Sequence, residues 1–257
     1  STMNISIQLA SPVIFENIML DAFLSKSENA TFLIPKVHFG ELFKNFESVF
    51  VNESNKIKYN KPIKNIQLIE GKYCIDNEEY YDDVLVTTPS FVTKRMLADI
   101  PIDIFVPEYS PILSIYIWLD RKLNDDIMVS AVDTCFDWLF NRDLTLDRKS
   151  NDYSYQMTVS DAVRFNKMKD ENIMTELEAD LRKMYDIGFH INDYKIVREL
   201  MATFKADKEN NAQRPIIQTE IKGLYLAGDY SRNGYPSTLE GAAKNGFIAA
   251  QHILKYT

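Results

Sequence analysis

The chain has 257 residues, of which 46% are apolar and 12% aromatic, and its formal net charge is −8. This length and apolar content allow one large or two small folded domains with a substantial core. The acidic balance, with no basic stretch that could follow a phosphate backbone, excludes a general nucleic-acid binder.

The N-terminal elements change from helical to strand periodicity. Apolar residues at helical spacing predict a helix over Pro12–Leu24. Pro35 and Gly40 predict a loop that leads into another short helix. From Lys56 to Asp76 the pattern predicts two strands, joined by a turn at Glu70–Gly71.

The middle of the chain alternates strands and helices. A nearly continuous apolar run at Pro111–Leu119 predicts a central strand that is covered on both faces. The other predicted elements are a strand at Asp83–Pro89, a helix at Phe91–Leu97, a strand at Tyr153–Ser160, a helix at Asp170–Tyr185, a strand at Lys195–Phe204 and a loop at Asn210–Thr219. Without repeats or a Gly/Ser linker, the fold class is α/β (α+β).

Cysteines and apolar runs indicate the compartment. Cys74 and Cys135 form no C-x-x-C pair and have no His at ligand spacing, which excludes a structural zinc site. They give no disulfide framework, which favours a reducing compartment. No apolar run approaches the ~20 residues that cross a bilayer, and no signal peptide opens the chain. We therefore expect a cytoplasmic protein that at most contacts a membrane surface.

The C-terminal segment predicts a strand, a polar loop and a helix. The strand ends at Asp229, the loop covers Tyr230–Tyr235, and Ser237 with Glu240 forms a capping box directly after Pro236. Such a unit directs free N–H groups and the positive end of a helix toward one point, where negative charge is stabilised. The alternative is that Asp229 merely terminates a strand and that the helix only packs.

The same segment carries a longer pattern, L-A-G-D-Y-x-x-x-G-Y-P-S-T-L-E-G-A-x-x-x-G, over residues 226–246. This pattern resembles the C-terminal FAD fingerprint of the flavin amine oxidase superfamily, which includes amine oxidases, protoporphyrinogen oxidases, phytoene desaturases and squalene-associated desaturases. The resemblance implies that FAD is the cofactor. It further implies contacts of Gly228 and Asp229 with the pyrophosphate and ribityl part, of Tyr235 and Pro236 with the isoalloxazine, and of the Thr238 and Leu239 backbone with the flavin pyrimidine ring.

Upstream segments resemble the same family. Asn60–Ile66 is similar to the strand that flanks the adenine, which implies adenine contact for Ile63; a core role is the alternative. Asp82–Pro89 resembles the strand that returns the chain to the nucleotide domain. FLIPKVHFGELF, and RELMATFKAD followed by Arg-Pro, resemble the squalene-associated, hydroxysqualene dehydroxylase branch. Lys36 and Met201 depart from the pattern of that branch and leave the substrate open.

The branch implies an apolar isoprenoid substrate, such as hydroxysqualene, squalene or a carotenoid-like hydrocarbon, and hydride transfer with the flavin. It also implies an apolar tunnel, for which the aromatic candidates are Phe32, Phe39, Phe43, Tyr116, Trp118, Trp138 and Phe140. The alternative is that these side chains fill a core, which is the more common role of aromatic residues. Arg214, beside Pro215, is a further candidate for cofactor contact.

No two of the eight glycines stand at G-x-G spacing, so the dinucleotide fingerprint G-x-G-x-x-G is absent from these 257 residues. We therefore expect the C-terminal portion of a two-domain flavoprotein with an incomplete nucleotide-binding domain. FAD would be held weakly or not at all, and activity would require an N-terminal FAD-binding polypeptide or a homo-oligomer. The expected divisions are 1–55 and 91–205 for the substrate domain, and 56–90 and 206–257 for the FAD-binding part.

Two rival functions stay open from sequence. One is a non-catalytic remnant or binding module of the same fold, which the missing fingerprint favours. The other is an amine-oxidase-type enzyme that acts on a polar amine. His38, His190 and His252 are scattered and have no nucleophile beside them, so hydrolytic triads are poorly supported.

Overall fold

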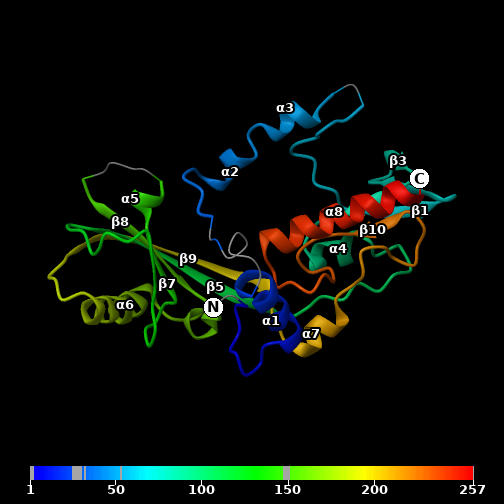
Figure 1. The fold of residues 1–257 in the computed structure, drawn as a ribbon. Coiled ribbons are helices and arrows are strands. Elements are labelled where there is room, and N and C mark those ends of the chain that lie inside the picture. Colours follow the sequence, from blue (N-terminus) through cyan, green and yellow to red (C-terminus); the bar gives the residue numbers. More distant parts are fainter. Residues whose placement is uncertain (1–2, 25–30, 32, 53, 147–150, 257) are drawn as a thin grey trace. The chain divides into compact units, whose positions relative to one another are not determined.

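The structure is a computed structural model that describes residues 3–24, 31, 33–52, 54–146 and 151–256 (Figure 1). Phe32, one of the predicted tunnel residues, lies outside the described residues. The chain forms two compact units: unit one lies within residues 31–59 and 110–202, and unit two within residues 2–30, 60–109 and 203–257. Because these are units of packing, the functional division expected from sequence stays a prediction.

Unit one is built on a five-stranded sheet with the order β6-β7-β8-β5-β9. Its strands are β5 (Tyr109–Leu119), β6 (Met128–Ser130), β7 (Trp138–Asn141), β8 (Tyr153–Val159) and β9 (Ile191–Phe204). Neighbours from β6 to β5 run antiparallel. The predicted strands are confirmed as β5, β8 and β9, whereas β6 and β7 were not predicted.

The core of unit one lies between this sheet and α6 (Asp170–Met184), which confirms the predicted helix. Ile115 and Ile117 of β5 are fully buried in one cluster with Leu177 of α6. The alternate side chains of β5 are only half-buried. The prediction that β5 is covered on both faces is therefore wrong, because a strand that alternates in this way buries one face. The shorter helices of unit one are α2 (Phe39–Leu42), α3 (Phe46–Phe50), α5 (Arg142–Thr145) and the 3₁₀ helix η2 (Ala162–Phe165).

Unit two contains an antiparallel sheet of β1 (Ile66–Ile69), β2 (Lys72–Ile75) and β3 (Glu79–Tyr81). The predicted turn joins β1 to β2, and both Glu70 and Gly71 have positive φ angles, of 49° and 82°. The hairpin is confirmed, although the first strand is shorter than predicted.

A second, parallel sheet pairs β4 (Val84–Val86) with β10 (Leu224–Leu226). On one face, Val86 and Leu226 pack in a cluster with Met96 of α4 (Ser90–Met96). On the other face, Leu85 packs in a cluster with Ala249 of α8 (Leu239–Tyr256). Figure 1 shows α8 alongside β10. The α8 side of the sheet is thus covered through Leu85 of β4 and through Ala227, directly after β10.

The predicted N-terminal helix is α1 (Pro12–Ile18), which continues as a π-helical turn, η1 (Met19–Phe23). The predicted loop over 210–219 is wrong in its first part, because α7 (Lys208–Gln213) occupies it. The carboxylate of Asp207 caps α7 by accepting the N–H of Asn210 at 2.7 Å. The sequence KENNAQ has one apolar residue, so α7 shows no amphipathic period.

No helix in the described part of the chain is long and apolar enough to span a membrane. The same residues contain no group of three or more His, Cys, Asp or Glu side chains placed to hold a metal ion. Cys74 and Cys135 are both buried as free thiols. Burial raises the pKa of the Cys135 thiol to about 12, so this thiol is unreactive at neutral pH.

Candidate functional site

The start of α8 is capped by Thr238, one residue later than predicted. Its Oγ1 accepts a hydrogen bond from the backbone N–H of Gly241 at 3.0 Å. Ser237, the predicted cap, instead donates its hydroxyl proton to the carboxylate of Asp229. The predicted Ser237–Glu240 capping box is therefore wrong, because Thr238 Oγ1 is the side-chain acceptor at the start of α8 and the Ser237 hydroxyl is turned toward Asp229.

A pocket of about 510 Å³ lies at the start of α8 and is called here the helix-start pocket. Its lining residues are Ile18, Asp21, Ala22, Tyr235, Pro236, Thr238 and Glu240. The first-turn N–H groups of a helix have no partner within the helix, and they lie at its positive end. The helix start therefore offers hydrogen bonds to a planar group that accepts them, while Asp21 and Glu240 make the rest of the lining acidic.

Tyr235 gives this pocket a neutral donor. Its hydroxyl donates to the carboxylate of Asp21. That hydrogen bond, followed by burial, raises the pKa of Tyr235 to about 12, so the phenol stays protonated at neutral pH. On the ring face, the ammonium of Lys244 lies 4.1 Å from the ring centroid, a cation–π distance. One wall of the pocket is thus fixed from two elements.

Gly241 allows α8 to begin tightly against the loop. A Cβ at this position would lie 3.2 Å from the carbonyl oxygen of Pro236 and 3.3 Å from both Thr238 Oγ1 and Tyr235 Cβ. These contacts are closer than ordinary Cβ packing, so a side chain would displace the loop. Close packing against the loop therefore explains why the motif has a glycine at position 241.

The inner side of the loop is held by Asn245, which is fully buried in α8. Its Nδ2 donates to the carbonyl oxygens of Gly228 (2.6 Å) and Ser231 (3.0 Å). Its Oδ1 is buried and has no partner among the described residues. Such an orphaned acceptor costs about 1–3 kcal/mol, so the site fits an additional donor from outside these residues.

The structure brings most of the predicted cofactor residues together. Tyr235, Pro236 and Thr238 line the helix-start pocket, and Gly228 with Asp229 adjoins it through the Ser237 hydroxyl. The Leu239 side chain is 71% exposed, so only its backbone faces the start of the helix. Ile63 does not line this pocket and packs in the β4–α4 core cluster. Its predicted adenine contact stays a prediction.

A second cavity, of about 460 Å³, lies in unit one and is called here the aromatic pocket. Three predicted tunnel residues line it: Phe39, Tyr116 and Phe140. Gln156 of β8 is the register partner of both Tyr116 and Phe140, so the amide stands between two rings. The other predicted tunnel residues that the structure describes, Phe43, Trp118 and Trp138, do not line this pocket. Its remaining lining residues, besides Gln156, are Leu33, Ile34, Pro35, Val37, His38, Arg142, Thr145 and Leu146.

The charge in the aromatic pocket is cationic. The guanidinium carbon of Arg142 lies 5.0 Å from the ring centroid of Tyr116. None of the described residues that line this pocket is an aspartate or glutamate. The cavity therefore favours an apolar ligand or one with an oxygen function over an ammonium ion.

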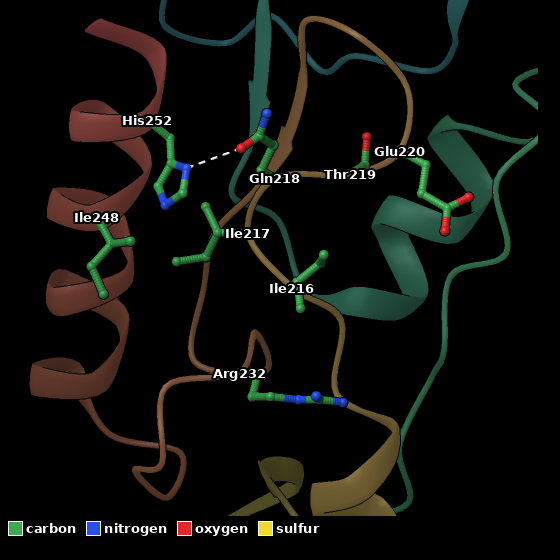
Figure 2. A pocket seen from close by; sticks show the side chains of 8 residues that line it. All are labelled: Ile216, Ile217, Gln218, Thr219, Glu220, Arg232, Ile248 and His252. Carbon is green, nitrogen blue, oxygen red and sulfur yellow. Dashed lines mark hydrogen bonds between the residues drawn. The ribbon is translucent and has the colours of Figure 1, made fainter. Parts of the chain in front are cut away.

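A surface depression of about 440 Å³ lies beside α8, and Figure 2 shows its eight lining side chains. The floor is formed by Ile216, Ile217 and Ile248. Nδ1 of His252 and Oε1 of Gln218 are 3.1 Å apart. Among the described residues that line this depression, the hydroxyl is that of Thr219, and it is bonded to the backbone of Ile221 and Leu224 rather than to His252.

Two residues at the site differ from what sequence indicated. Arg214, a candidate for cofactor contact, is instead buried inside the loop and bonded to it. Asp21 was not predicted at all, because it comes from the N-terminal helix region, 214 residues before Tyr235. No local pattern signals a contact of that separation.

Comparisons with known proteins agree on one family. Residues 34–254 match the sequence profile of the flavin containing amine oxidoreductases. The hydroxysqualene dehydroxylase of Zymomonas mobilis is 25% identical over 176 residues, which are 68% of this chain and 40% of that protein. That of Sinorhizobium fredii is 29% identical over 197 residues, which are 74% of this chain and 45% of that protein. The chain thus spans less than half the length of these relatives.

Solved structures show the same fold at low sequence identity. A protein from Exiguobacterium, provisionally assigned as a protoporphyrinogen oxidase, aligns with a TM-score of 0.59 at 16% identity, over 93% of this chain and 58% of that chain. Reduced UDP-galactopyranose mutase aligns with a TM-score of 0.58 at 12% identity, over 85% and 52%. These likenesses establish the fold class and carry no information on substrate.

Proposed function

The chain belongs to the flavin containing amine oxidoreductase family, and from this premise we propose that it is the C-terminal portion of an FAD-dependent oxidoreductase acting on an apolar isoprenoid. The observation that carries the proposal is the helix-start pocket. There, Tyr235, Pro236 and Thr238 of the fingerprint line one cavity at the positive end of α8.

FAD fits this pocket by the chemistry of its donors. The first-turn N–H groups of α8 would receive the electron-rich edge of the flavin ring, and Asp229 would accept hydrogen bonds from flavin hydroxyls. The orphaned Oδ1 of Asn245 supports an outside donor near Gly228. When bound, FAD supplies a ring that exchanges a hydride with a substrate carbon. The residues of this chain bind and orient it.

The substrate class is supported by the aromatic pocket and by the names of the relatives, which are hydroxysqualene dehydroxylases and phytoene desaturases. Apolar and aromatic side chains dominate the described lining, which suits a hydrocarbon. A polar amine would enter as a cation, and the described residues that line the pocket meet it with Arg142 and no carboxylate. This charge favours an isoprenoid over an amine.

FAD retention, we propose, requires a complementary nucleotide-binding polypeptide. The 257 residues contain no G-x-G-x-x-G to cradle the pyrophosphate. Within the described residues, β4 has β10 as its only strand neighbour, although parallel sheets are almost always larger and covered. The outer face of α8 also carries Leu239, Phe247 and Leu254, which are 71%, 66% and 80% exposed. An open strand edge and an apolar helix face are both suited to a docked α/β unit.

The proposal is tested by colour. The purified chain is mixed with a polypeptide that carries the family's N-terminal nucleotide-binding region and with FAD, and unbound flavin is removed. We expect flavin absorbance to stay with the protein in the mixture and to be weak or absent for the chain alone. Asp229→Ala should reduce retention in the mixture, because it removes the carboxylate at the loop. Full retention by Asp229→Ala would contradict the site, and no retention by the parent mixture would contradict the function.

A further inference from the structure

The loop of the helix-start pocket is built around one guanidinium. Arg214 is 1% exposed, and its donors converge on residues 229–235. Its partners are the carbonyl oxygens of Asp229 (2.9 Å), Tyr230 (3.2 Å), Ser231 (2.5 Å) and Tyr235 (2.7 Å), and the side-chain oxygens of Asn211 (3.3 Å) and Asn233 (3.1 Å). Four carbonyls of one short loop thus share a single donor group.

Burying the charge of Arg214 is unfavourable, so other interactions must compensate for its loss of water. Burial is the main cause that lowers the pKa of Arg214, to about 10, which leaves it charged at neutral pH. In the described residues no carboxylate oxygen accepts a hydrogen bond from Arg214, although the negative charge of Asp229 partly opposes the lowering of its pKa. Its guanidinium carbon lies 4.5 Å from the ring centroid of Phe204, which adds a cation–π contact. The charge is compensated mainly by the loop it organises.

Asn233 extends this organisation to the helix. Its Oδ1 accepts from Arg214 Nη2 at 3.1 Å and from the backbone N–H of Tyr235 at 2.9 Å. Its Nδ2 donates to the carbonyl oxygen of Gly241 in the first turn of α8, at 2.8 Å. Arg214 is therefore connected through one side chain to the helix start that lines the pocket.

We propose that Arg214 is a positioning residue for the cofactor: it fixes residues 229–235 and, through Asn233, their alignment with the start of α8. This inference rests on the proposed function. Only a planar fork with five N–H donors can bond several diverging carbonyls at once. A lysine at this place would keep the charge and lose the fork, so charge and geometry can be separated by substitution.

The test uses this chain together with the proposed nucleotide-binding polypeptide. Arg214→Lys is compared with Arg232→Lys, which makes the same chemical change in the same loop. Arg232 is exposed and donates one bond of 2.7 Å, to the carbonyl of Ala212. Three quantities are measured: amide hydrogen exchange of residues 229–235 without flavin, the FAD dissociation constant from fluorescence quenching, and the visible absorption bands of the bound flavin.

We expect Arg214→Lys to speed exchange in residues 229–235, to weaken FAD binding about tenfold (about 1.4 kcal/mol) and to shift the flavin bands. Arg232→Lys should change none of the three. Parent-like FAD affinity and bands in folded Arg214→Lys would overturn the inference and leave the proposed function standing. Absence of FAD binding by the parent would instead remove the proposed function. Should Arg214→Lys fail to fold, Asn233→Ala decides by the same measurements, since it removes the link from Arg214 to α8 together with the bond to the Tyr235 N–H.

Discussion

Gly234 and Gly246 lie in the same C-terminal motif but in opposite environments. Gly234 has a φ of +80°, and a Cβ there would lie 2.4 Å from Nδ2 of Asn17. That amide also donates to the Gly234 carbonyl oxygen at 3.0 Å. Gly246 is inside α8, and a Cβ on it would meet no atom within 4 Å. The two glycines therefore serve different purposes.

Alanine substitutions at these positions should change stability in opposite directions. Gly234→Ala should lower the free energy of unfolding by about 1–2 kcal/mol, because a side chain is strained at positive φ. Gly246→Ala should raise it by up to ~1 kcal/mol, because alanine is the better helix former and has room. Urea unfolding of the two variants and the parent measures both effects. A neutral Gly234→Ala would show that the contact with Asn17 relaxes without cost.

The sequence could predict some residues of the site and not others, and the difference is their separation along the chain. Tyr235, Pro236 and Thr238 lie within four positions, so one local motif identifies all three. Asp21 reaches the same pocket across 214 residues, and Asn17 reaches Gly234 across 217. Contacts of this separation arise from tertiary packing, which a single sequence does not display.

The element that most affects the site is α8, and its cap provides a test. Thr238→Ala should destabilise the protein by about 1 kcal/mol, because the N–H of Gly241 loses its acceptor. Ser237→Ala should leave the cap intact and remove only the bond to Asp229. Denaturant unfolding of both variants distinguishes the observed cap from the predicted one. A larger loss for Ser237→Ala than for Thr238→Ala would favour the predicted capping box.

Elements were predicted where they are long enough to show a period. α6 has 15 residues and β5 has 11, so their buried positions repeat several times. β6 and β7 have three and four residues, too few to establish alternation. The fold class and the order of the main elements were therefore accessible from sequence. Phe140 of β7 was a tunnel candidate from the family resemblance, but the strand that carries it into the aromatic pocket was not predicted.

At the scale of the whole molecule, α8 is apolar on two sides. Ala249 and Ile248 pack on the β4–β10 sheet, while Leu239, Phe247 and Leu254 are exposed at a spacing of seven or eight residues. An exposed apolar stripe on a helix that already packs by another face marks a surface for further packing. The curated relatives are more than twice as long as the matched segment, so their folds include further chain. The exposed stripe of α8 is where we expect the proposed nucleotide-binding polypeptide to pack.

A charge in this stripe should weaken that association without unfolding the chain. Phe247→Glu places a carboxylate where the interface must exclude water, so binding should fall at least about tenfold. Val163→Glu also places a carboxylate on an exposed apolar residue, but outside α8, and serves as the control. Light scattering of each variant, mixed with the proposed nucleotide-binding polypeptide, measures how much complex forms. Equal complex formation by Phe247→Glu and the parent would show that this face of α8 is not the interface. Loss of self-association in the chain alone would assign the stripe to a second copy instead.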